Sequence, residues 1–276
     1  MKIDSHQHFW KYNPDEYGWI SKEMKVLQKD HLPIHLKTHL QTIGFDGSVT
    51  IQARQSLEET KWLLELAEEN DFIKGVVGWV DLRSNQVEEQ LAELSVHPKL
   101  VGIRHVIHDE PDVDFMLQPD FLKGISLLQK FNLTYDILIF PNHLPNSLKL
   151  VDHFPNQVFI LDHISKPFIK DKITTPWDDE IRLLARYPNV YCKLSGMVTE
   201  ADWKNWKPDD FRIYLQVVFE AFGTDRLMIG SDWPVCTVAG SYKQVMDIVM
   251  DFTGNMSVSD QDKILGGNAV HVYKLK

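Results

Sequence analysis

The sequence has little cysteine and no long hydrophobic run. Its two cysteines, Cys192 and Cys236, form neither a C-x-x-C motif nor a disulfide framework, a pattern that favours structural thiols in a reducing cytoplasm. No apolar run reaches the roughly 18 residues that span a bilayer. No charged head with an apolar core marks a signal peptide, and His6 lies too near Met1 to follow a presequence. We therefore expect a cytoplasmic protein with no membrane partner.

Positive charge is also scarce. The 276 residues include 29 Lys and Arg against 39 Asp and Glu, which gives a net charge of −10. This balance argues against nucleic acid as a partner, because a nucleic-acid-binding surface needs an excess of cations. The hydrophobic fraction of 43% and the charged fraction of 25% are typical of a globular protein. A small molecule is the expected partner, and a homo-oligomer is compatible with this composition.

The chain also lacks a linker that would divide it. Without a Pro/Gly/Ser-rich or low-complexity segment, residues 1–276 are expected to form one domain. Segment 11–36 reads as a long irregular loop, and a lid or simple packing is equally open as its role. Elsewhere, short apolar runs typical of buried strands alternate with amphipathic helical segments. The strand-like runs begin near Ile3, Gly47, Gly75, Leu100, Leu133, Val158, Val190 and Arg226.

The helical segments complete about eight strand-then-helix units, the number that a (β/α)8 TIM barrel needs. One helix is expected to begin at Ser56, with Glu59 completing a capping box. A doubly wound open sheet is the main alternative, but no G-x-G-x-x-G motif follows any strand. The sequence therefore predicts an α/β fold of the (β/α)8 barrel class. The other expected helices cover 87–97, 119–131, 144–153, 178–186, 210–222 and 242–252.

Polar side chains gather at nearly every predicted strand end, where a (β/α)8 barrel places its reactive residues. Charges there would carry heavy desolvation costs unless they are paired or bound to a metal. A polar ring of this kind favours a functional mouth over a set of helix caps and ion pairs. The residues are His6, His8, Gln52, Arg54, Asp81, Arg104, His105, Asp136, Asp162, His163, Lys193, Ser195, Ser231 and Asp232.

Four of these residues suggest a metal site. His6 and His8 stand two apart on the first strand, so both side chains project to one side. With His163 they offer three neutral nitrogen ligands, a number that suits a catalytic zinc ion with one open position. Asp232 can contact that ion and accept a proton from water, whose pKa a bound ion lowers. One divalent ion, zinc before others, is therefore the expected cofactor.

Other strand-end residues can serve a substrate. Arg104 and His105 can hold a substrate oxygen or stabilise the oxyanion that forms during acyl transfer. For the remaining candidates, structural pairing or packing is an equal alternative to substrate contact. The candidates for contacts with a polyhydroxylated ring are Gln52, Arg54, Asp81, Lys166, Trp10 and Trp233.

Six motifs spread over nearly the whole chain resemble one family. They are DSHQHFW at 4–10, GIRH at 102–105, LDHISKP at 161–167, YCKLSG at 191–196, GSDWP at 230–234 and GNA at 267–269. In combination they are similar to the amidohydrolase superfamily, in the amidohydrolase-2 branch that contains the L-fuconolactonases and L-rhamnonolactonases. The resemblance implies a (β/α)8 barrel with a first-strand H-x-H, a sixth-strand His and an eighth-strand Asp. The corresponding residues are His6, His8, His163 and Asp232.

The resemblance has one departure. Binuclear members of the superfamily carry a metal-bridging Lys or Glu on the fourth or fifth strand and a His on the fifth. This chain has Arg104, His105 and Asp136 there, which implies at most one metal ion. Because some lactonases of this branch work without metal, a metal-free route stays open. In that route Asp232 acts on a free water, while the histidines and Arg104 bind the substrate.

The activity that the resemblance implies is hydrolysis of a sugar-derived lactone, such as L-fucono- or L-rhamnono-lactone, to its aldonic acid. Asp232 would deprotonate water, and the ion on His6, His8 and His163, or those histidines with Arg104, would stabilise the oxyanion. Asp232 or His105 would then protonate the leaving ring oxygen. Two alternatives remain: metal-dependent, non-hydrolytic decarboxylation in the same superfamily, and a catalytically silent sugar-acid binding protein.

Overall fold

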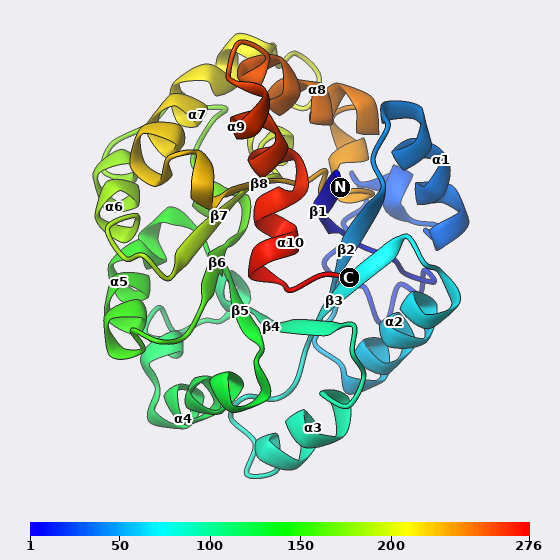
Figure 1. Ribbon diagram of the computed structural model, residues 1–276, viewed down its shortest axis with the longest axis vertical. Helices are drawn as coiled ribbons and strands as arrows, with labels where there is room; N and C mark the ends of the chain where they lie inside the picture. Colours follow the sequence, from blue (N-terminus) through cyan, green and yellow to red (C-terminus); the bar gives the residue numbers. More distant parts are fainter.

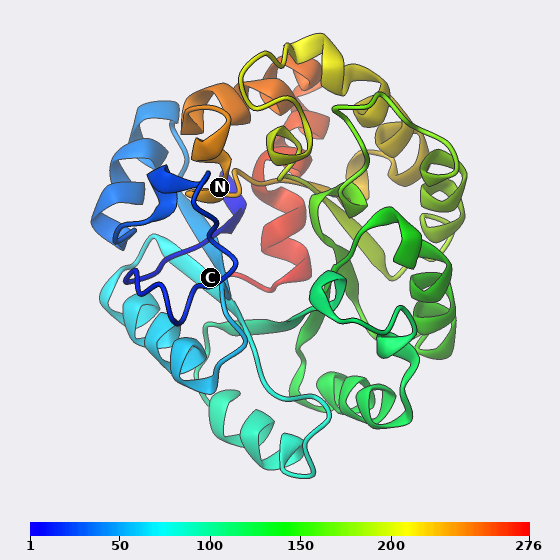
Figure 2. The same cartoon turned by 180° about the vertical axis from the view of Figure 1, so that it is seen from behind.

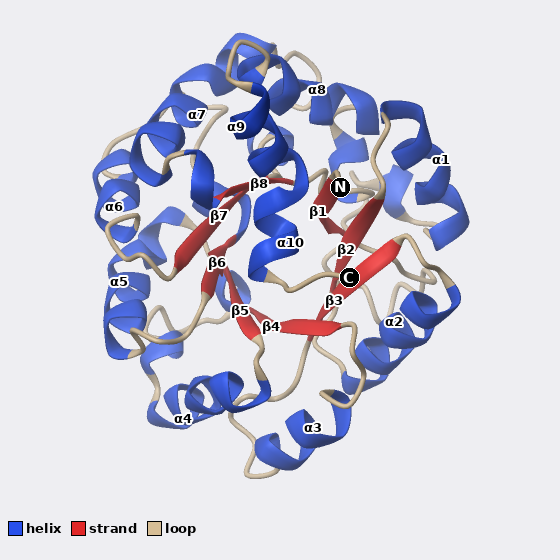
Figure 3. Cartoon of the chain, viewed as in Figure 1, coloured by secondary structure: helices blue, strands red, loops and turns tan.

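The computed structural model describes residues 1–276 and contains one sheet of eight parallel strands in the order β1 to β8 (Figures 1 and 3). The ring closes where Gln7 bridges to Trp233, and the His8 amide donates to the Trp233 carbonyl oxygen at 2.7 Å. The predicted (β/α)8 barrel is confirmed. The doubly wound alternative is wrong, because each strand pairs with its neighbours in sequence. The strands are β1 (Ile3–Gln7), β2 (Gly47–Ile51), β3 (Ile73–Gly78), β4 (Leu100–Val106), β5 (Thr134–Leu138), β6 (Phe159–Leu161), β7 (Val190–Leu194) and β8 (Leu227–Ile229).

Most of the helices surround this ring as an outer layer (Figure 3). The predicted helices are confirmed to within a few residues at their ends, because their apolar faces recur at helical spacing and pack on the barrel. None of the helices is both long and apolar enough to cross a membrane. They are α1 (Pro33–Ile43), α2 (Leu57–Glu69), α3 (Val87–Leu94), α4 (Pro119–Leu128), α5 (Leu144–His153), α6 (Trp177–Leu184), α7 (Pro208–Phe222), α8 (Tyr242–Thr253), α9 (Val258–Asp262) and α10 (Asn268–Val272).

Segment 11–36 is only partly irregular, as α1 begins within it at Pro33. The sequence pattern did not predict this helix, and the reason is its weak apolar stripe. Only Pro33, Leu36 and Leu40 are buried along α1. The loop before α1 packs on itself in a small separate cluster. Its buried members are Trp10, Tyr17, Ile20 and Leu27.

Helix α10 and the residues after it close the amino-terminal end of the barrel. In Figure 1 α10 lies across the centre of the strand ring, and Figure 2 shows the opposite face. Val272, Tyr273 and Leu275 pack there against inward side chains of the strands, among them Ile3 and Val77. Because apolar side chains fill this end, a substrate cavity can open only at the carboxyl ends of the strands.

The start of α2 has half of the predicted capping box. The Ser56 hydroxyl accepts a hydrogen bond of 3.2 Å from the Glu59 amide. The other half of the prediction, a hydrogen bond from the Ser56 amide to the Glu59 side chain, is wrong. Glu59 Oε2 accepts instead from the amides of Ala53 and Arg54, both at 2.9 Å. Glu59 Oε1 accepts from the Tyr17 hydroxyl at 3.1 Å. Burial raises the pKa of Glu59 to about 7, so a carboxyl group that titrates near neutral pH holds the loop after β2.

Replacing Glu59 with Gln should change how stability depends on pH. The pKa of Glu59 is about 7 in the folded chain against an ordinary 4.5, so the unfolded chain loses this proton first as pH rises. The wild-type protein therefore loses about 3 kcal/mol of stability between these two values. Gln resembles the protonated acid but does not titrate, so the Glu59→Gln protein should not lose this stability as pH rises. Urea unfolding at about pH 5 and about pH 8 measures the difference between the two proteins at each pH.

Glu58→Gln is the matched control for this experiment. Glu58 lies on the same helical turn but is exposed, and a hydrogen bond from the Ser56 hydroxyl lowers its pKa. Its substitution should not remove a pH-dependent loss of stability. A Glu59→Gln difference that stays constant across this pH range would contradict the prediction.

Candidate active site

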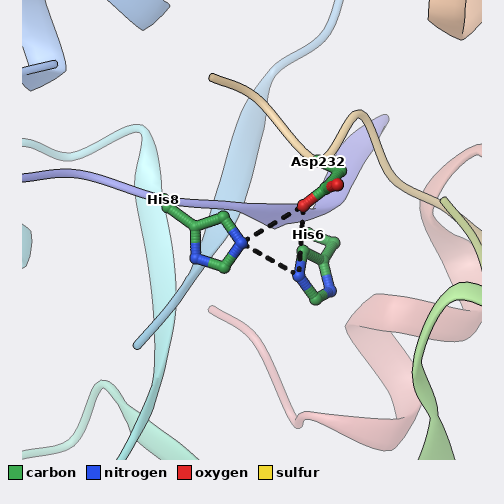
Figure 4. A group of neighbouring side chains, drawn as sticks. All are labelled: His6, His8 and Asp232. Atoms are coloured by element: carbon green, nitrogen blue, oxygen red, sulfur yellow. Dashed lines mark hydrogen bonds and ion pairs between the residues drawn. The ribbon is translucent and has the colours of Figure 1, made fainter. Parts of the chain in front are cut away.

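His6 and His8 lie at the carboxyl end of β1, and their rings point to one side, as the spacing predicts (Figure 4). Their Nε2 atoms are 3.2 Å apart. His8 Nδ1 donates to the Ile51 carbonyl oxygen at 2.8 Å. That bond requires the proton of the neutral ring on Nδ1, so the lone pair lies on Nε2. His8 therefore presents a ligand nitrogen toward His6.

Asp232 reaches the same point from the turn just after β8. Its Oδ1 lies 3.2 Å from His8 Nε2 and 3.8 Å from His6 Nε2 (Figure 4). The Asp232 amide donates to the His6 carbonyl oxygen at 2.8 Å. The backbone φ of Asp232 is 57°, a left-handed conformation that non-glycine residues adopt mainly where structure around them enforces it.

The buried carboxylate of Asp4 fastens the turn that carries Asp232. It accepts from the Ser231 amide at 2.9 Å, the Ser231 hydroxyl at 2.6 Å and the Tyr242 hydroxyl at 3.0 Å. Burial raises the pKa of Asp4 to about 6. Asp4 is thus a positioning residue, which links β1, the end of β8 and α8 next to Asp232.

His163 lies in a left-handed turn after β6. Residues 163–166 have φ angles of 55°, 48°, 63° and 49°, and the Trp177 indole holds the turn by donating to the Ile164 carbonyl oxygen at 2.8 Å. Gly196 has a φ of 61°, and a Cβ there would collide with the His163 ring, so this position requires glycine. His163 Nδ1 lies 2.9 Å from Ser195 Oγ. Its Nε2 faces Asp232 Oδ1 at 3.9 Å.

The electrostatics of this group are those of one carboxylate, Asp232, beside the neutral imidazoles of His6 and His163. Burial lowers the pKa of His163 to about 3, against the attraction of Asp232. Burial also lowers the pKa of His6 well below its usual range. For Asp232, burial by itself would raise the pKa, but the neighbouring imidazoles hold it well below its usual range. At neutral pH the site therefore offers imidazole lone pairs and one negative charge.

A fully buried ionic cluster lies behind His6. Lys193 Nζ is 2.5 Å from Asp136 Oδ2 and 3.0 Å from Asp162 Oδ1, and none of the three side chains is exposed. The Tyr273 hydroxyl donates to Asp136 Oδ2 at 2.7 Å. Asp162 Oδ1 in turn lies 3.3 Å from His6 Nδ1. These contacts orient the His6 ring, and each charge depends on its partners for compensation.

Arg104 enters from β4 with two of its three nitrogens engaged. Nη1 donates to Asp162 Oδ2 at 3.0 Å and lies 3.3 Å from His6 Nε2, while Nη2 donates to the Gln52 carbonyl oxygen at 2.5 Å. Arg104 Nε is buried and has no partner. A buried N–H without an acceptor is costly. Because Arg104 lines the cavity described below, its guanidinium group brings a positive charge to the cavity wall.

Ligand spacing tests whether these residues fit a metal ion. A tetrahedral ion with bonds of about 2.0–2.1 Å places neighbouring ligand atoms about 3.3 Å apart. The Nε2 atoms of His6 and His8 and Oδ1 of Asp232 stand 3.2, 3.2 and 3.8 Å apart, so they fit one divalent ion. A second group of His6, Asp162 and His163 is less suitable, because two cations already neutralise Asp162.

A cavity of about 310 Å³ opens beside these residues. Its wall contains three kinds of side chain, which come from the carboxyl ends of strands and from the turns and loops that follow them. The residues of the candidate metal and oxyanion group are His8, His163, Asp232 and Arg104. The other polar residues are Lys166, Glu200, His108, Asp109 and Thr199. The apolar and aromatic residues are Trp19, Met24, Ala53, Val106, Leu138, Trp203 and Val235.

His105 is not brought to this cavity. Alternate residues of a strand face opposite sides, so with Arg104 directed inward, His105 faces the helices. Its ring stacks on Phe115 with centroids 4.9 Å apart, and its Nε2 lies 2.7 Å from Glu110 Oε1. The expectation that His105 binds a substrate oxygen or protonates the leaving group therefore needs correction.

The predicted substrate contacts also divide. Lys166 lines the cavity. Gln52 is buried, and its backbone carbonyl oxygen accepts a hydrogen bond from Arg104 Nη2. Arg54 forms an ion pair of 2.9 Å with Glu16. The remaining three lie away from the cavity because packing or a local turn engages their side chains. Asp81 is exposed and accepts from the Arg83 amide at 3.0 Å, and Trp10 and Trp233 are buried against other aromatic rings.

Sequence reasoning missed several lining residues because it considered only the strand ends. Glu200, His108 and Asp109 lie a few residues further along, in loops after β7 and β4. Charged residues in the loops that follow strands of a predicted barrel were the available signal, since these loops form the mouth. Trp203 had no such signal, because tryptophans are frequent throughout the chain.

Comparisons with known proteins give consistent results. The Amidohydrolase family model (Amidohydro_2) matches residues 3–275. An L-fucono-1,5-lactonase of Burkholderia multivorans is 40% identical over 288 residues, covering 100% of this chain and 96% of the relative. An L-fucono-1,5-lactonase of Burkholderia ambifaria is 33% identical with the same coverage of 100% and 96%. A crystal structure of an amidohydrolase from Burkholderia multivorans with bound zinc is 39% identical, with a TM-score of 0.96 over 100% of both chains.

The family match extends over nearly the whole barrel and includes all six motifs of the sequence. The resemblance that those motifs carried is therefore confirmed, and the chain belongs to the Amidohydro_2 family of amidohydrolases.

Proposed function

We propose that this chain hydrolyses a sugar-derived lactone, such as L-fucono-1,5-lactone, to its aldonic acid. The observation that carries the proposal is the ionised carboxylate of Asp232, which faces the neutral imidazole of His163 on the wall of a cavity at the carboxyl end of the barrel. The two relatives named L-fucono-1,5-lactonase support the same class of substrate.

The residues around the cavity divide the reaction between them. Asp232 accepts a proton from the water that attacks the lactone carbonyl carbon. The positively charged guanidinium group of Arg104 on the cavity wall stabilises the carbonyl oxygen as negative charge develops on it. When the carbonyl reforms, the ring C–O bond breaks and the ring oxygen takes the proton from Asp232. The carboxylate is then restored for the next cycle.

We further propose that His6, His8, His163 and Asp232 hold one divalent ion, with zinc the best match to nitrogen ligands. Such an ion, when bound, lowers the pKa of water and polarises a carbonyl group. The metal-free route is the alternative. There, Asp232 deprotonates a free water, Arg104 stabilises the carbonyl oxygen, and the imidazole lone pairs accept hydrogen bonds from substrate hydroxyl groups.

Two other functions are less well supported. Non-hydrolytic decarboxylation is open to the family, but the relatives at 40% and 33% identity are named as lactonases. A silent sugar-acid binding protein would not need a carboxylate base beside three imidazoles. The free buried thiols Cys192 and Cys236 support a cytoplasmic location, and one barrel containing all the strands supports a single domain over residues 1–276.

Proton release in a weakly buffered indicator tests the proposed function against L-fucono-, L-rhamnono-, D-galactono- and L-arabinono-lactone. We expect rapid hydrolysis of one or a few, well above the spontaneous rate. Parallel assays of chelator-treated and zinc-supplied protein separate the two routes: restoration by zinc supports the ion, and equal rates support the metal-free route. Silence across the panel with folded, zinc-supplied protein would contradict lactone hydrolysis. Carbon dioxide release or binding of an aldonic acid without turnover would then identify an alternative.

A further inference from the structure

Lys166 and Glu200 form a polar pair on the cavity wall that the proposed reaction does not use. Lys166 ends the left-handed turn after β6, and Glu200 lies in a short helical turn, η7 (Val198–Glu200), after β7. Both loops belong to the face of the barrel seen in Figure 2. Lys166 Nζ and Glu200 Oε1 are 2.8 Å apart, and the side chains are only 16% and 19% exposed. The pair is therefore largely withdrawn from water while it faces the cavity.

Hydrogen-bonding capacity is left over on both members of the pair. Glu200 Oε1 takes the contacts with Lys166 Nζ at 2.8 Å and Thr199 Oγ1 at 3.4 Å, whereas Oε2 accepts none. Lys166 Nζ uses one of its three N–H groups. One negatively charged acceptor and two positively charged donors thus stand side by side. Neighbouring hydroxyl groups on a ring match this arrangement, because one can donate to the carboxylate while the other accepts from the ammonium group.

The backbone and the surroundings hold this pair in place. The Lys166 amide donates to the His163 carbonyl oxygen at 2.8 Å, within the left-handed turn that also places His163. Lys166 Nζ lies 6.0 Å from the centre of the Phe140 ring, against which the His108 ring also packs at 4.6 Å. The left-handed turn therefore fixes the position of the Lys166 ammonium group relative to the His163 imidazole. Strained backbone of this kind is typical of binding sites.

The rest of the wall leaves few alternatives for binding hydroxyl groups. Four lining residues, His8, His163, Asp232 and Arg104, belong to the candidate metal and oxyanion group. The rest of the lining is apolar or aromatic except for Thr199, His108, Asp109 and this pair. The pair neutralises itself, and Asp109 adds a negative charge, so this wall has no excess of cations to attract a second carboxylate. Neutral hydroxyls suit it better than an anionic group.

We propose that Glu200 and Lys166 together form a subsite for a vicinal diol, which selects lactones that carry neighbouring ring hydroxyls. This inference rests on the proposed function and narrows it to polyhydroxylated neutral lactones. Glu200 Oε2 accepts from one hydroxyl, and Lys166 Nζ donates to the next. The pair acts in binding and takes no part in proton transfer.

Glu200→Ala with two lactones of the same ring tests the subsite. L-fucono-1,5-lactone carries the ring hydroxyls, and δ-hexanolactone has the same six-membered ring and methyl group without them. We expect kcat/KM for the hydroxylated lactone to fall about 10- to 100-fold, as when a hydrogen bond to a charged group is lost. The value for δ-hexanolactone should change by less than about threefold. Glu200→Gln keeps an acceptor oxygen but loses the negative charge, and Lys166→Met removes the N–H donors. Both substitutions should therefore lower kcat/KM more for the hydroxylated lactone than for δ-hexanolactone.

A binding measurement covers the case in which δ-hexanolactone reacts too slowly to compare. 1,5-Anhydro-L-fucitol has the hydroxylated ring without the carbonyl, and Trp19 and Trp203 on the cavity wall provide fluorescence to follow it. We expect its Kd to rise about 10- to 100-fold in Glu200→Ala. Glu220→Gln is the matched control, because it also breaks an ion pair of 2.8 Å, with Arg182, but on the outer helices. It should leave both readouts unchanged.

The outcomes separate this subsite from the proposed function. If the wild-type protein opens no sugar lactone, the proposed function fails. If it does, and Glu200→Ala lowers kcat/KM equally for both lactones or leaves the Kd unchanged, the pair only joins two loops and the diol subsite is overturned.

Discussion

Replacing Asp232 with Asn should lower kcat by about 10²- to 10⁴-fold, the usual contribution of a positioned general base. Asn has the same size and keeps one oxygen near His8, but it cannot accept the proton from water. The neighbouring imidazoles hold the pKa of Asp232 well below its usual range, so the wild-type carboxylate is ionised at neutral pH. Stopped assays of lactone hydrolysis at saturating substrate measure the change.

Two controls belong with this variant. The melting temperature and the affinity for the aldonic acid product should stay close to those of the wild type, because the substitution preserves volume. Asp247→Asn removes a carboxylate that pairs with Lys243 at 2.7 Å on α8, outside the cavity, and should keep full activity. Near-normal turnover by Asp232→Asn would rule out the proposed mechanism.

Replacing Lys193 with Met should destabilise the protein by about 3–5 kcal/mol, the usual cost of removing one partner from a buried ion pair. Lys193 compensates Asp136 and Asp162, and all three side chains are inaccessible to water. Asp162 would keep Arg104 at 3.0 Å. Asp136 would keep no cation and only the hydroxyls of Tyr273 and Thr134, at 2.7 and 3.3 Å. Urea unfolding gives the free energy change.

A second substitution identifies the cause of that loss. Asp136→Asn in the Lys193→Met background removes the uncompensated carboxylate and should restore part of the stability. Lys61→Met is the exposed control: it breaks a 2.7 Å pair with Glu93 on the surface and should cost less than about 1 kcal/mol. A Lys193→Met protein as stable as the Lys61→Met protein would show that the buried cluster contributes little.

Local patterns in the sequence were sufficient for the fold. Continuous apolar runs predicted the strands, helical spacing predicted the helices from α2 to α8, and their alternation predicted a closed parallel barrel. Helix α1 was not predicted, because few of its residues are buried and its apolar spacing is weak. Candidate site residues could also be selected from the sequence. The two-residue spacing of His6 and His8 directs both side chains to one side, and polar residues end the strands.

Other features of the site became visible only in three dimensions. Alternation along β4 says that Arg104 and His105 face opposite sides, but not which one faces the cavity. Neighbours in sequence also separate, as Asp232 reaches the reaction group while Trp233 packs against Phe9. The pairs Lys166 with Glu200 and Lys193 with Asp136 join residues 34 and 57 positions apart.

The sequence by itself therefore determined the barrel and the strand ends at which the candidate site residues lie, because each depends on the local period of strands and helices. Only the tertiary structure decided which polar side chains face the cavity and which charges neutralise one another. The physical reason is that burial and ion pairing depend on distances between strands and loops, which no local pattern of residues specifies.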